Sequence, residues 1–483
     1  MKFEKLFVAI CFKVASIIIL WRNEMSLSRR QILKCIAAAP LVNLAACSTA
    51  PFGSKHSYLS QIIKPQNQNT VFHWIDVILQ QIRDQRVTPP RAAYNLAMPM
   101  VAGFLAANGI TQDYQEPYSL GKGPSNANPE IAYGIAFAVA AAEVFQQPFM
   151  AEKSEFLERF ENSEAKSLAI VWGKKVGRHV VRMRNNDGAE PSEVNFYLGR
   201  YQRRDDSLKW RPTGPFYSAQ PGPAFDSFDR GLFPGQGQIR PWTMSSGSQF
   251  RAAEFYDPAS PEFAKEFETI RLLGGADSAI RTKDQSEIAL FWEDGPWGLT
   301  PPGHFIYIGM QVLQNQNLSL IELARSFALL GMTQCDASIA AWDSKYFYDV
   351  VRPESAIRVR AEQFGNTDQR VTRQANWRSY IPTPNFPTYT SGHSTFGAAG
   401  TETIALIQGD DKISLTGQSP DLVIWPQLRD INRHWTSLSA IAEENGMSRL
   451  YGGVHWQLDH TQAKVAGRNI AQQAFSTFFQ KRV

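Results

Sequence analysis

The segment LSLIELARSFALLGMTQCDASIAAWDSKYFYDVV, residues 318–351, is the longest continuous helical pattern in the chain. Its apolar residues recur at helical spacing, whereas a half-buried strand would alternate apolar and polar residues. The pattern predicts one long, largely buried helix. The rest of the chain shows whether this helix belongs to an all-helical protein or alternates with strands.

Further helical patterns occur on both sides of this segment, and strand-like alternation is scarce. They cover residues 71–82, 89–107, 131–145, 154–184, 261–273, 284–292, 304–315, 393–407, 437–446 and 455–479. Residues 188–260 are rich in Pro, Gly and aromatic residues, which predicts loops that wrap over the helices. We therefore expect an all-α fold of two packed helical bundles with long Pro/Gly/aromatic-rich loops.

The predicted organisation has four parts. An export signal is expected at 1–47, a polar tether at 48–70, a helical region with wrapping loops at 71–260, and a catalytic helical domain at 261–483. The 483 residues suffice for one large or two medium domains.

The positive charge of the chain is concentrated at its start. The formal net charge is +4, but residues 1–46 contain seven Lys/Arg and only two Asp/Glu. The remaining residues contain 42 basic and 43 acidic side chains. This balance argues against a nucleic-acid partner for the body of the protein.

The leader contains two motifs in the order that lipoprotein export requires. Residues 28–34, SRRQILK, resemble a twin-arginine signal, and residues 44–47, LAAC, resemble a lipoprotein-processing box with Cys47 as the lipidated residue. The alternative is a basic patch before a short apolar helix. Met25 is a second candidate start. We expect a periplasmic or outer-surface protein that contacts the membrane only through a lipid anchor, with Cys335 as the one cysteine left in its body.

Three short blocks contain the residues suited to chemistry, and the first is SKYFYDVVRP, residues 344–353. Lys345 and Arg352 are seven residues apart, which on one continuous helix places both cations on the same face. Their long side chains could then converge on one anion. The alternative for this block alone is two solvated surface cations.

The second block is PTYTSGH, residues 387–393, before an apolar helix. The Ser391 hydroxyl and the Gly392 N–H lie where a helix N-terminus offers donors to an anion. His393 is placed for proton transfer. The alternative is a Ser N-cap beside a structural histidine.

The third block is SRLYGGVHWQLD, residues 448–459. Arg449 precedes a Gly-Gly turn that leads to His455. Asp459 follows His455 by four residues, so it can accept the Nδ1–H of His455 and leave Nε2 bare. The alternative is an ordinary pair on a helix surface.

Together the three blocks resemble the motif of the type 2 phosphatidic acid phosphatase and vanadium haloperoxidase superfamily. Thr390 departs from the Pro that the family usually has before Ser-Gly-His, a change expected to affect loop stiffness and not ligation. The resemblance implies a vanadate cofactor bound through His455 Nε2, with proton transfer by His393. It also implies that the equatorial oxygens are held by Lys345, Arg352, Ser391, Gly392 and Arg449. The other histidines, His460 among them, are expected to be structural.

The motif alone does not separate two chemistries, because vanadate resembles the transition state of phosphoryl transfer. One is a haloperoxidase that oxidises halide with hydrogen peroxide. The other is an acid phosphatase that hydrolyses a phosphate ester through a phosphohistidine. A surface oxyanion-binding protein is a third possibility, which His393 and Asp459 disfavour because simple binding needs neither.

Two aromatic residues favour the peroxidase. In similar vanadium enzymes, rings at the positions of Trp342 and Phe386 line a halide pocket. Core packing is the alternative for both rings. The sequence also predicts a carboxylate partner for Arg449, for which Asp284, Glu287 and Asp294 are candidates. The halide and the oligomeric state stay undetermined.

Overall fold

The structure is a computed structural model. It describes residues 69–189, 198–200, 204, 206–212, 230–295, 298–422 and 424–482. These residues all fall in one compact unit. The predicted export motifs, Met25, Cys47 and nearly all of the tether lie outside the described residues, and the proposed division at residue 260 stays a prediction.

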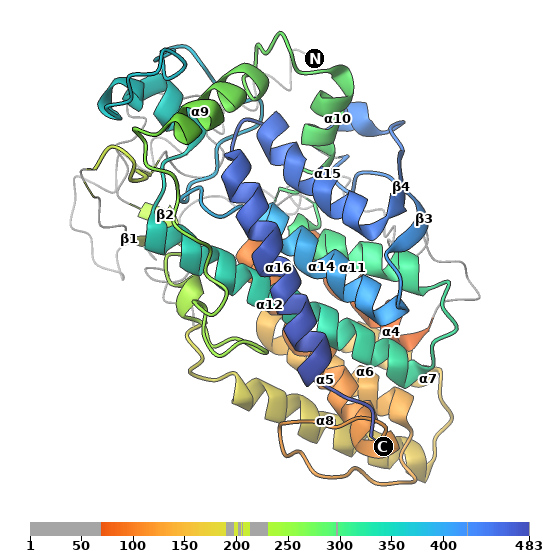
Figure 1. Cartoon of the computed structure of the whole chain (residues 1–483). Coiled ribbons are helices and arrows are strands. Elements are labelled where there is room, and N and C mark those ends of the chain that lie inside the picture. Colours follow the sequence, from red (N-terminus) through yellow and green to blue (C-terminus); the bar gives the residue numbers. More distant parts are fainter. Residues whose placement is uncertain are drawn as a thin grey trace, which may run out of the picture. The chain divides into compact units, whose positions relative to one another are not determined.

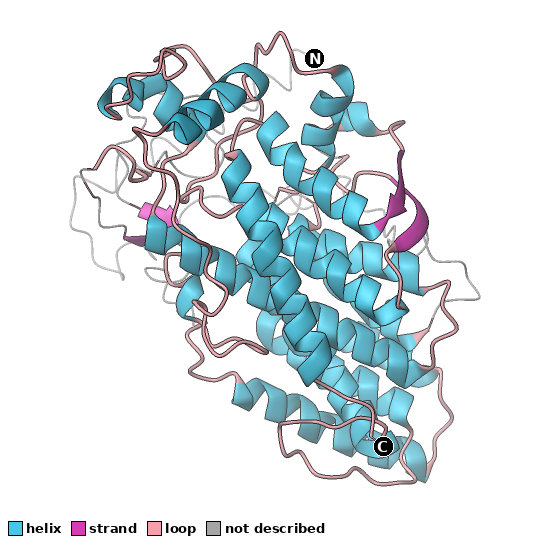
Figure 2. Ribbon diagram, viewed as in Figure 1, coloured by secondary structure: helices cyan, strands magenta, loops and turns pink. Residues whose placement is uncertain are grey.

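The all-α prediction is confirmed, since helices make up most of the described chain (Figure 2). The first group of helices is α4 (Thr70–Asp84), α5 (Pro89–Thr111), α6 (Pro129–Phe145), α7 (Met150–Glu158) and α8 (Glu164–Met183). The second group is α9 (Pro261–Leu273), α10 (Lys283–Phe291), α11 (Thr300–Leu313), α12 (Leu320–Tyr348), α13 (Pro353–Ser355), α14 (Gly392–Gln408), α15 (Leu438–Tyr451) and α16 (Gln457–Thr477).

Helices α5 and α12 join the two groups. Helix α5 packs against α6 on one side and against α12 on the other, and α6 also contacts α8. Helix α14 packs against α12, α15 and α16, and α11 covers α14. Figure 1 shows α5, α6 and α8 in the lower part of the molecule and α12, α14 and α16 above them. One continuous apolar core runs through both groups.

A second, smaller apolar cluster lies under α9 and supports the loops that reach the site. Phe263 and Phe267 of α9 pack against Trp456, with ring centroids 5.7 and 6.3 Å apart. Phe255 packs against Tyr389 at 5.2 Å. Both Tyr389 and Trp456 are buried and directly adjoin predicted site segments. Dense packing of this kind holds such loops in one position.

Helix α12 is shorter than predicted at its C-terminal end. Its start is capped by a reciprocal pair of hydrogen bonds between Ser319 and Glu322. Its end lies at Tyr348, where Asp349 adopts a left-handed conformation with φ 58°. The prediction that Lys345 and Arg352 share two turns of one helix is therefore wrong. Arg352 instead precedes the short helix α13.

The structure also differs from the prediction by containing two short antiparallel pairs of strands. Strand β1 (Leu198–Arg200) pairs with β2 (Arg230–Leu232), and β3 (Lys412–Gly417) pairs with β4 (Arg433–Ser437). The second pair lies between the predicted helices at 393–407 and 437–446, where no strand was predicted. Trp435 of β4 is buried 5.8 Å from the ring of Trp292, so this hairpin covers the end of α10. Short helical turns complete the chain at η4 (Gln236–Gln238), η5 (Ala356–Arg360), η6 (Ala361–Gln363) and η7 (Pro426–Leu428).

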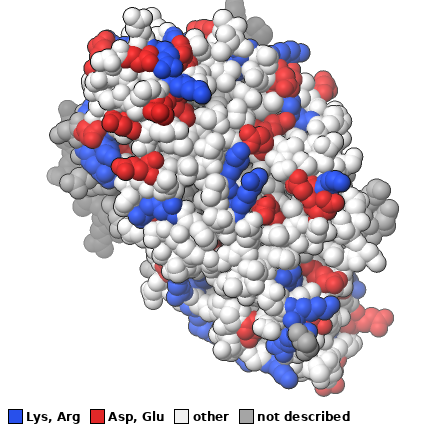
Figure 3. Space-filling view, in the orientation of Figure 1, with Lys and Arg blue, Asp and Glu red and all other residues white. Residues whose placement is uncertain are grey.

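The described surface is mixed in charge. On the face drawn in Figure 3, basic and acidic side chains are interspersed over the described residues. Among the described helices, none combines the length and apolar character needed to cross a bilayer.

Candidate active site

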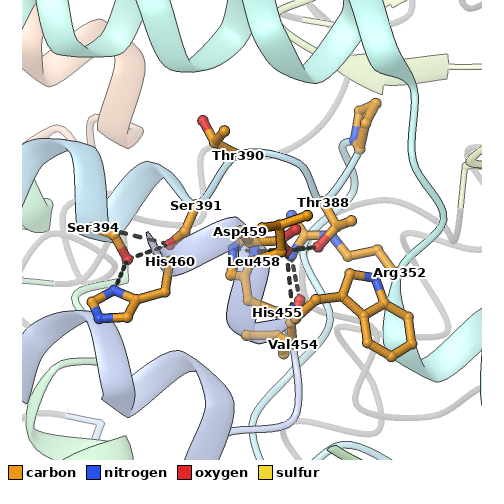
Figure 4. Close-up of polar contacts among 12 residues, drawn as sticks. Arg352, Thr388, Thr390, Ser391, Ser394, Val454, His455, Leu458, Asp459 and His460 are labelled. Carbon is orange, nitrogen blue, oxygen red and sulfur yellow. Dashed lines mark hydrogen bonds and ion pairs between the residues drawn. The ribbon is translucent and has the colours of Figure 1, made fainter. Parts of the chain in front are cut away.

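His455 lies in the turn between α15 and α16, two residues before α16 begins, and its side chain is buried. Its Nδ1 atom is 2.6 Å from Asp459 Oδ2, the contact that the spacing predicted. Its Nε2 atom is 3.3 Å from a terminal nitrogen of Arg352. A guanidinium can only donate, so Nε2 has no hydrogen and Nδ1 has one. Figure 4 shows His455, Asp459 and Arg352 converging in this way.

The His455 imidazole is held neutral. Burial lowers its pKa well below the ordinary value, and the charges of Arg352, Lys345 and Arg449 lower it further. A neutral ring with a bare Nε2 can act as a ligand or as a nucleophile.

Thr388 completes the support of His455, and the sequence did not predict this role. Its Oγ1 lies 3.1 Å from His455 Nδ1 and donates a short hydrogen bond to Asp459 Oδ2. The backbone N–H of Trp456 donates to the same carboxylate oxygen at 3.1 Å. Burial raises the pKa of Asp459 to about 6, while the Thr388 hydroxyl opposes this rise. The Thr388 hydroxyl, the Trp456 N–H and the His455 ring all contact Oδ2, an arrangement that suits an ionised carboxylate.

Arg352 reaches the site from the start of α13. Its Nε donates to the carbonyl of Phe386 at 2.8 Å, and a terminal nitrogen donates to the carbonyl of Val454 at 2.7 Å. Its guanidinium also lies 4.8 Å from the ring of Phe386. These contacts fix a fully buried cation beside His455.

Lys345, on α12, is also fully buried. Its Nζ donates to the carbonyls of Pro387, Thr388 and Thr390 at 3.1, 2.8 and 2.5 Å. These three bonds use all donors of an ammonium group. Lys345 thus orders the loop before Ser391. Burial and the charges of Arg352 and Arg449 lower the pKa of Lys345 well below its ordinary value, whereas the three carbonyl acceptors favour its ammonium form. Because the Thr390 contact involves only the backbone, the departure from Pro at this position preserves it.

Ser391 is the N-cap of α14, as predicted for the second block. Its hydroxyl oxygen accepts from the Ser394 backbone N–H at 3.3 Å, and its own N–H donates to the carbonyl of Asp459 at 3.1 Å. The second bond ties the start of α14 to the start of α16. A Cβ on Gly392 would meet the Trp342 ring at 3.3 Å, so glycine permits this close approach.

His393 follows on the first turn of α14 and points into the same cavity. Its Nε2 lies 3.3 Å from the carbonyl of Glu293, which can only accept, so Nε2 carries the hydrogen. Burial lowers the pKa of His393 well below the ordinary value, and Arg449 lowers it further. A neutral His393 keeps Nδ1 free of hydrogen and able to take a proton.

Arg449 lies near the end of α15 and donates to the carbonyl of Trp292 at 3.3 Å. Burial raises the pKa of Glu293, and the charge of Arg449 opposes this rise, so Glu293 is a further candidate for the carboxylate partner of Arg449. The three predicted candidates have contacts of their own. Asp284 pairs with Arg433, Glu287 with Lys283, and Asp294 with His304.

Most predicted residues surround one cavity. Gly392, His393, Arg449 and His455 line it together with the rings of Trp342 and Phe386. The two rings are 4.9 Å apart, and Trp342 Nε1 donates to the carbonyl of Leu232. Lys345, Arg352, Ser391 and Asp459 lie buried behind this lining. The lining also includes residues from the N-terminal half that were not predicted, Thr88, Pro89, Pro90, Leu232 and Phe233.

The electrostatics of the cavity fit an oxyanion. Three basic side chains, Lys345, Arg352 and Arg449, are at most 3% exposed. Buried carboxylates also lie nearby: Glu293 and Asp294 line the cavity, and Asp459 contacts His455. A bare imidazole nitrogen, a helix N-terminus and buried guanidinium groups form a donor set suited to vanadate or phosphate.

Fold and site thus define an all-α protein with a buried, histidine-centred oxyanion site. Residues 325–482 match the model of the VCPO second helical-bundle domain. The vanadium chloroperoxidase of Curvularia inaequalis is 26% identical over 239 residues, which cover 40% of this chain and 39% of that protein.

Solved structures resemble the chain over most of its length. A bacterial vanadium-dependent iodoperoxidase superposes with a TM-score of 0.70 at 21% identity, covering 85% of this chain and 96% of that one. A bacterial vanadium-dependent chloroperoxidase in its apo form has a TM-score of 0.62 at 18% identity, covering 81% and 94%. These two show a shared fold. The family match over residues 325–482 and the curated relative support a vanadium haloperoxidase-like protein.

Proposed function

We propose that the protein is a vanadate-dependent haloperoxidase. The observation that supports this most directly is the bare Nε2 of His455, which lies 3.3 Å from a terminal nitrogen of Arg352. His455 lines a cavity together with Arg449, Trp342 and Phe386. When bound, vanadate would activate hydrogen peroxide for the two-electron oxidation of a halide.

Different residues would bind the vanadium and the oxygens of the vanadate. His455 would bind the vanadium through Nε2, with Asp459 and Thr388 holding the ring in its Nδ1–H tautomer. Arg352, Arg449, Ser391 and the Gly392 N–H would hold the equatorial oxygens, and Lys345 would add its charge from behind the loop.

His393 would move the proton. Its neutral ring donates Nε2–H to the Glu293 carbonyl, so Nδ1 is the atom that would accept a proton from peroxide. Its low pKa favours prompt release of that proton. The rings of Trp342 and Phe386 would exclude water and favour a weakly hydrated halide.

One experiment separates this function from phosphatase activity. The purified protein is incubated with orthovanadate, and peroxide-dependent oxidation of iodide, bromide and chloride is measured beside hydrolysis of p-nitrophenyl phosphate. Halide oxidation that requires vanadate is the expected result. Hydrolysis that vanadate inhibits, without halide oxidation, would favour the phosphatase and overturn the proposal.

His455→Ala tests the site within that experiment, and His434→Ala is its matched control because His434 is exposed on β4. The first variant should lose vanadate binding and turnover. The second should retain both.

We also propose export by the twin-arginine signal and anchoring at Cys47. Expression with and without Cys47→Ser, followed by fractionation, tests the anchor. Membrane association that persists in the variant would contradict it.

A further inference from the structure

A row of four polar side chains connects the molecular surface to the oxyanion site. Glu443 of α15 lies 3.3 Å from His460 Nε2, and His460 Nδ1 lies 2.9 Å from Ser394 Oγ. Ser394 Oγ donates to Ser391 Oγ at 3.0 Å. Figure 4 shows the last three of these residues in line, beside His455 and Asp459.

The inner part of the row is sealed from water. His460, Ser394 and Ser391 are 0% exposed, whereas the Glu443 side chain is 51% exposed. Helix α15 makes room for the imidazole with Gly446, where an added Cβ would come within 2.0 Å of His460 Nδ1. The contact between His460 and Ser394 is thus built by three helices.

Glu443 is ionised and faces the imidazole. Its hydrogen bond with His460 and its contact with Lys464 lower its pKa to about 2. The carboxylate accepts the Nε2–H of His460. The groups that face the ring are therefore Glu443 from α15, Lys464 one turn further along α16 through its contact with Glu443, and the Ser394 hydroxyl from α14.

The protonation of His460 determines the direction of the remaining hydrogen bonds. A doubly protonated ring donates Nδ1–H to Ser394, so the Ser394 hydroxyl must turn to Ser391. Ser391 Oγ then accepts, and its own hydrogen is available for an oxyanion. This is the direction that the Ser394–Ser391 contact has in the structure.

A neutral ring with hydrogen on Nε2 reverses this order. Ser394 then donates to the bare Nδ1, and its oxygen becomes an acceptor for the Ser391 hydroxyl. The Ser391 hydrogen is drawn away from the oxyanion, or must be shared with it.

We infer that Glu443, His460 and Ser394 form a positioning relay that aims the Ser391 hydroxyl at a bound oxyanion. The inference rests on the proposed oxyanion site and extends it to three residues that do not contact the anion. It gives His460 a role in place of the structural role predicted from the sequence.

Ser394→Ala tests the relay most directly, because it removes the hydroxyl that links His460 to Ser391. Thr401→Val is the matched control, since it removes another buried hydroxyl from the same helix at a distance from the relay. Binding of orthovanadate, and separately of inorganic phosphate, is measured by calorimetry between about pH 5 and pH 8, where histidine titrates. Thermal unfolding of each variant verifies its fold.

The relay predicts about 3- to 10-fold weaker binding by Ser394→Ala at the acidic end, the range expected for one hydrogen bond. The difference in anion affinity between the wild type and Ser394→Ala should become smaller as the pH rises. The anions themselves titrate in this range, so the informative quantity is the ratio of the two affinities at each pH. The ratio of the wild-type affinity to the Thr401→Val affinity should stay near one at every pH.

Glu443→Gln provides a second variant on the partly exposed end of the row, with Glu402→Gln as its surface control. Loss of the carboxylate should move the fall in affinity to lower pH. Wild-type affinities at every pH in both Ser394→Ala and Glu443→Gln would overturn the relay alone. Failure of the wild type to bind either anion would overturn the oxyanion site and the relay together, whereas binding without halide oxidation would contradict only the peroxidase.

Discussion

Glu266 Oε2 accepts a hydrogen bond of 2.6 Å from the backbone N–H of Gln457, the first residue of α16. Its other oxygen accepts from Leu458 N–H at 3.1 Å. A carboxylate of α9 therefore caps the helix that begins just after His455, and it compensates the unpaired N–H groups there.

This cap makes stability depend on pH. Burial raises the pKa of Glu266 from 4.5 to about 7. A carboxyl with a raised folded pKa contributes most below its unfolded value, and the contribution is lost as the pH rises through the folded value. We expect the urea midpoint of the wild type to fall between about pH 5 and pH 8. Glu266→Gln should flatten that fall, whereas the exposed Glu262→Gln should not. Parallel curves for all three proteins would contradict the prediction.

Replacing Thr388 tests the support of His455. Thr388→Val removes the hydroxyl that lowers the pKa of Asp459, so that pKa should move above about 6. Orthovanadate binding should weaken by about 10-fold, and the acidic limb of its pH profile should shift to higher pH. Thr388→Ser retains the hydroxyl and should restore both. Equal pH profiles for the Thr388→Val and Thr388→Ser variants would show that the Thr388 hydroxyl does not support His455.

The two site histidines should separate binding from turnover. His455→Ala loses the proposed ligand and should bind orthovanadate at least about 100-fold more weakly. His393→Ala removes a neutral group and should retain vanadate affinity within a few fold, while kcat for halide oxidation falls by about 100-fold or more. Calorimetry and steady-state kinetics measure the two effects. Loss of vanadate affinity in His393→Ala would show that His393 also helps to bind the vanadate.

Phe386 lines the proposed halide pocket and also contacts two buried basic side chains. Its ring lies 5.0 Å from Lys345 Nζ and 4.8 Å from the Arg352 guanidinium. Phe386→Leu keeps an apolar side chain but removes the ring face, so the free energy of unfolding should fall by about 1 kcal/mol. The ratio of kcat/KM values among chloride, bromide and iodide should change as well. An unchanged ratio would place the halide elsewhere in the cavity.

The long helices could be predicted from the sequence because each buries an apolar face that repeats along the chain. The predicted helix over residues 261–273 coincides with α9, and α14 and α16 differ from prediction by only a few residues at their ends. The predicted end of α12 was wrong because Asp349 ends the helix in a left-handed conformation. The sequence has no Gly or Pro at that position that would have indicated this end. The β3–β4 hairpin was missed because its strands lie in a polar segment and are short.

Most of the residues gathered around the cavity could be predicted because they lie in three compact sequence blocks. Thr388 lies inside one block and was still missed, since its role depends on a contact with α16. Glu293 was not among the predicted candidates for the partner of Arg449, because the direction of its side chain into the cavity cannot be read from the sequence. Glu266 and Gln457 are 191 residues apart, and only the packing of α9 shows that they touch.

Thr88, Pro89 and Pro90 at the start of α5 line the same cavity as His455 and Arg449, although they lie more than 350 residues earlier in the chain. Substitutions at these three positions can change the shape of the cavity without replacing a residue of the three sequence blocks. The shape of the cavity and the residues proposed to bind the oxyanion can therefore diverge independently in evolution.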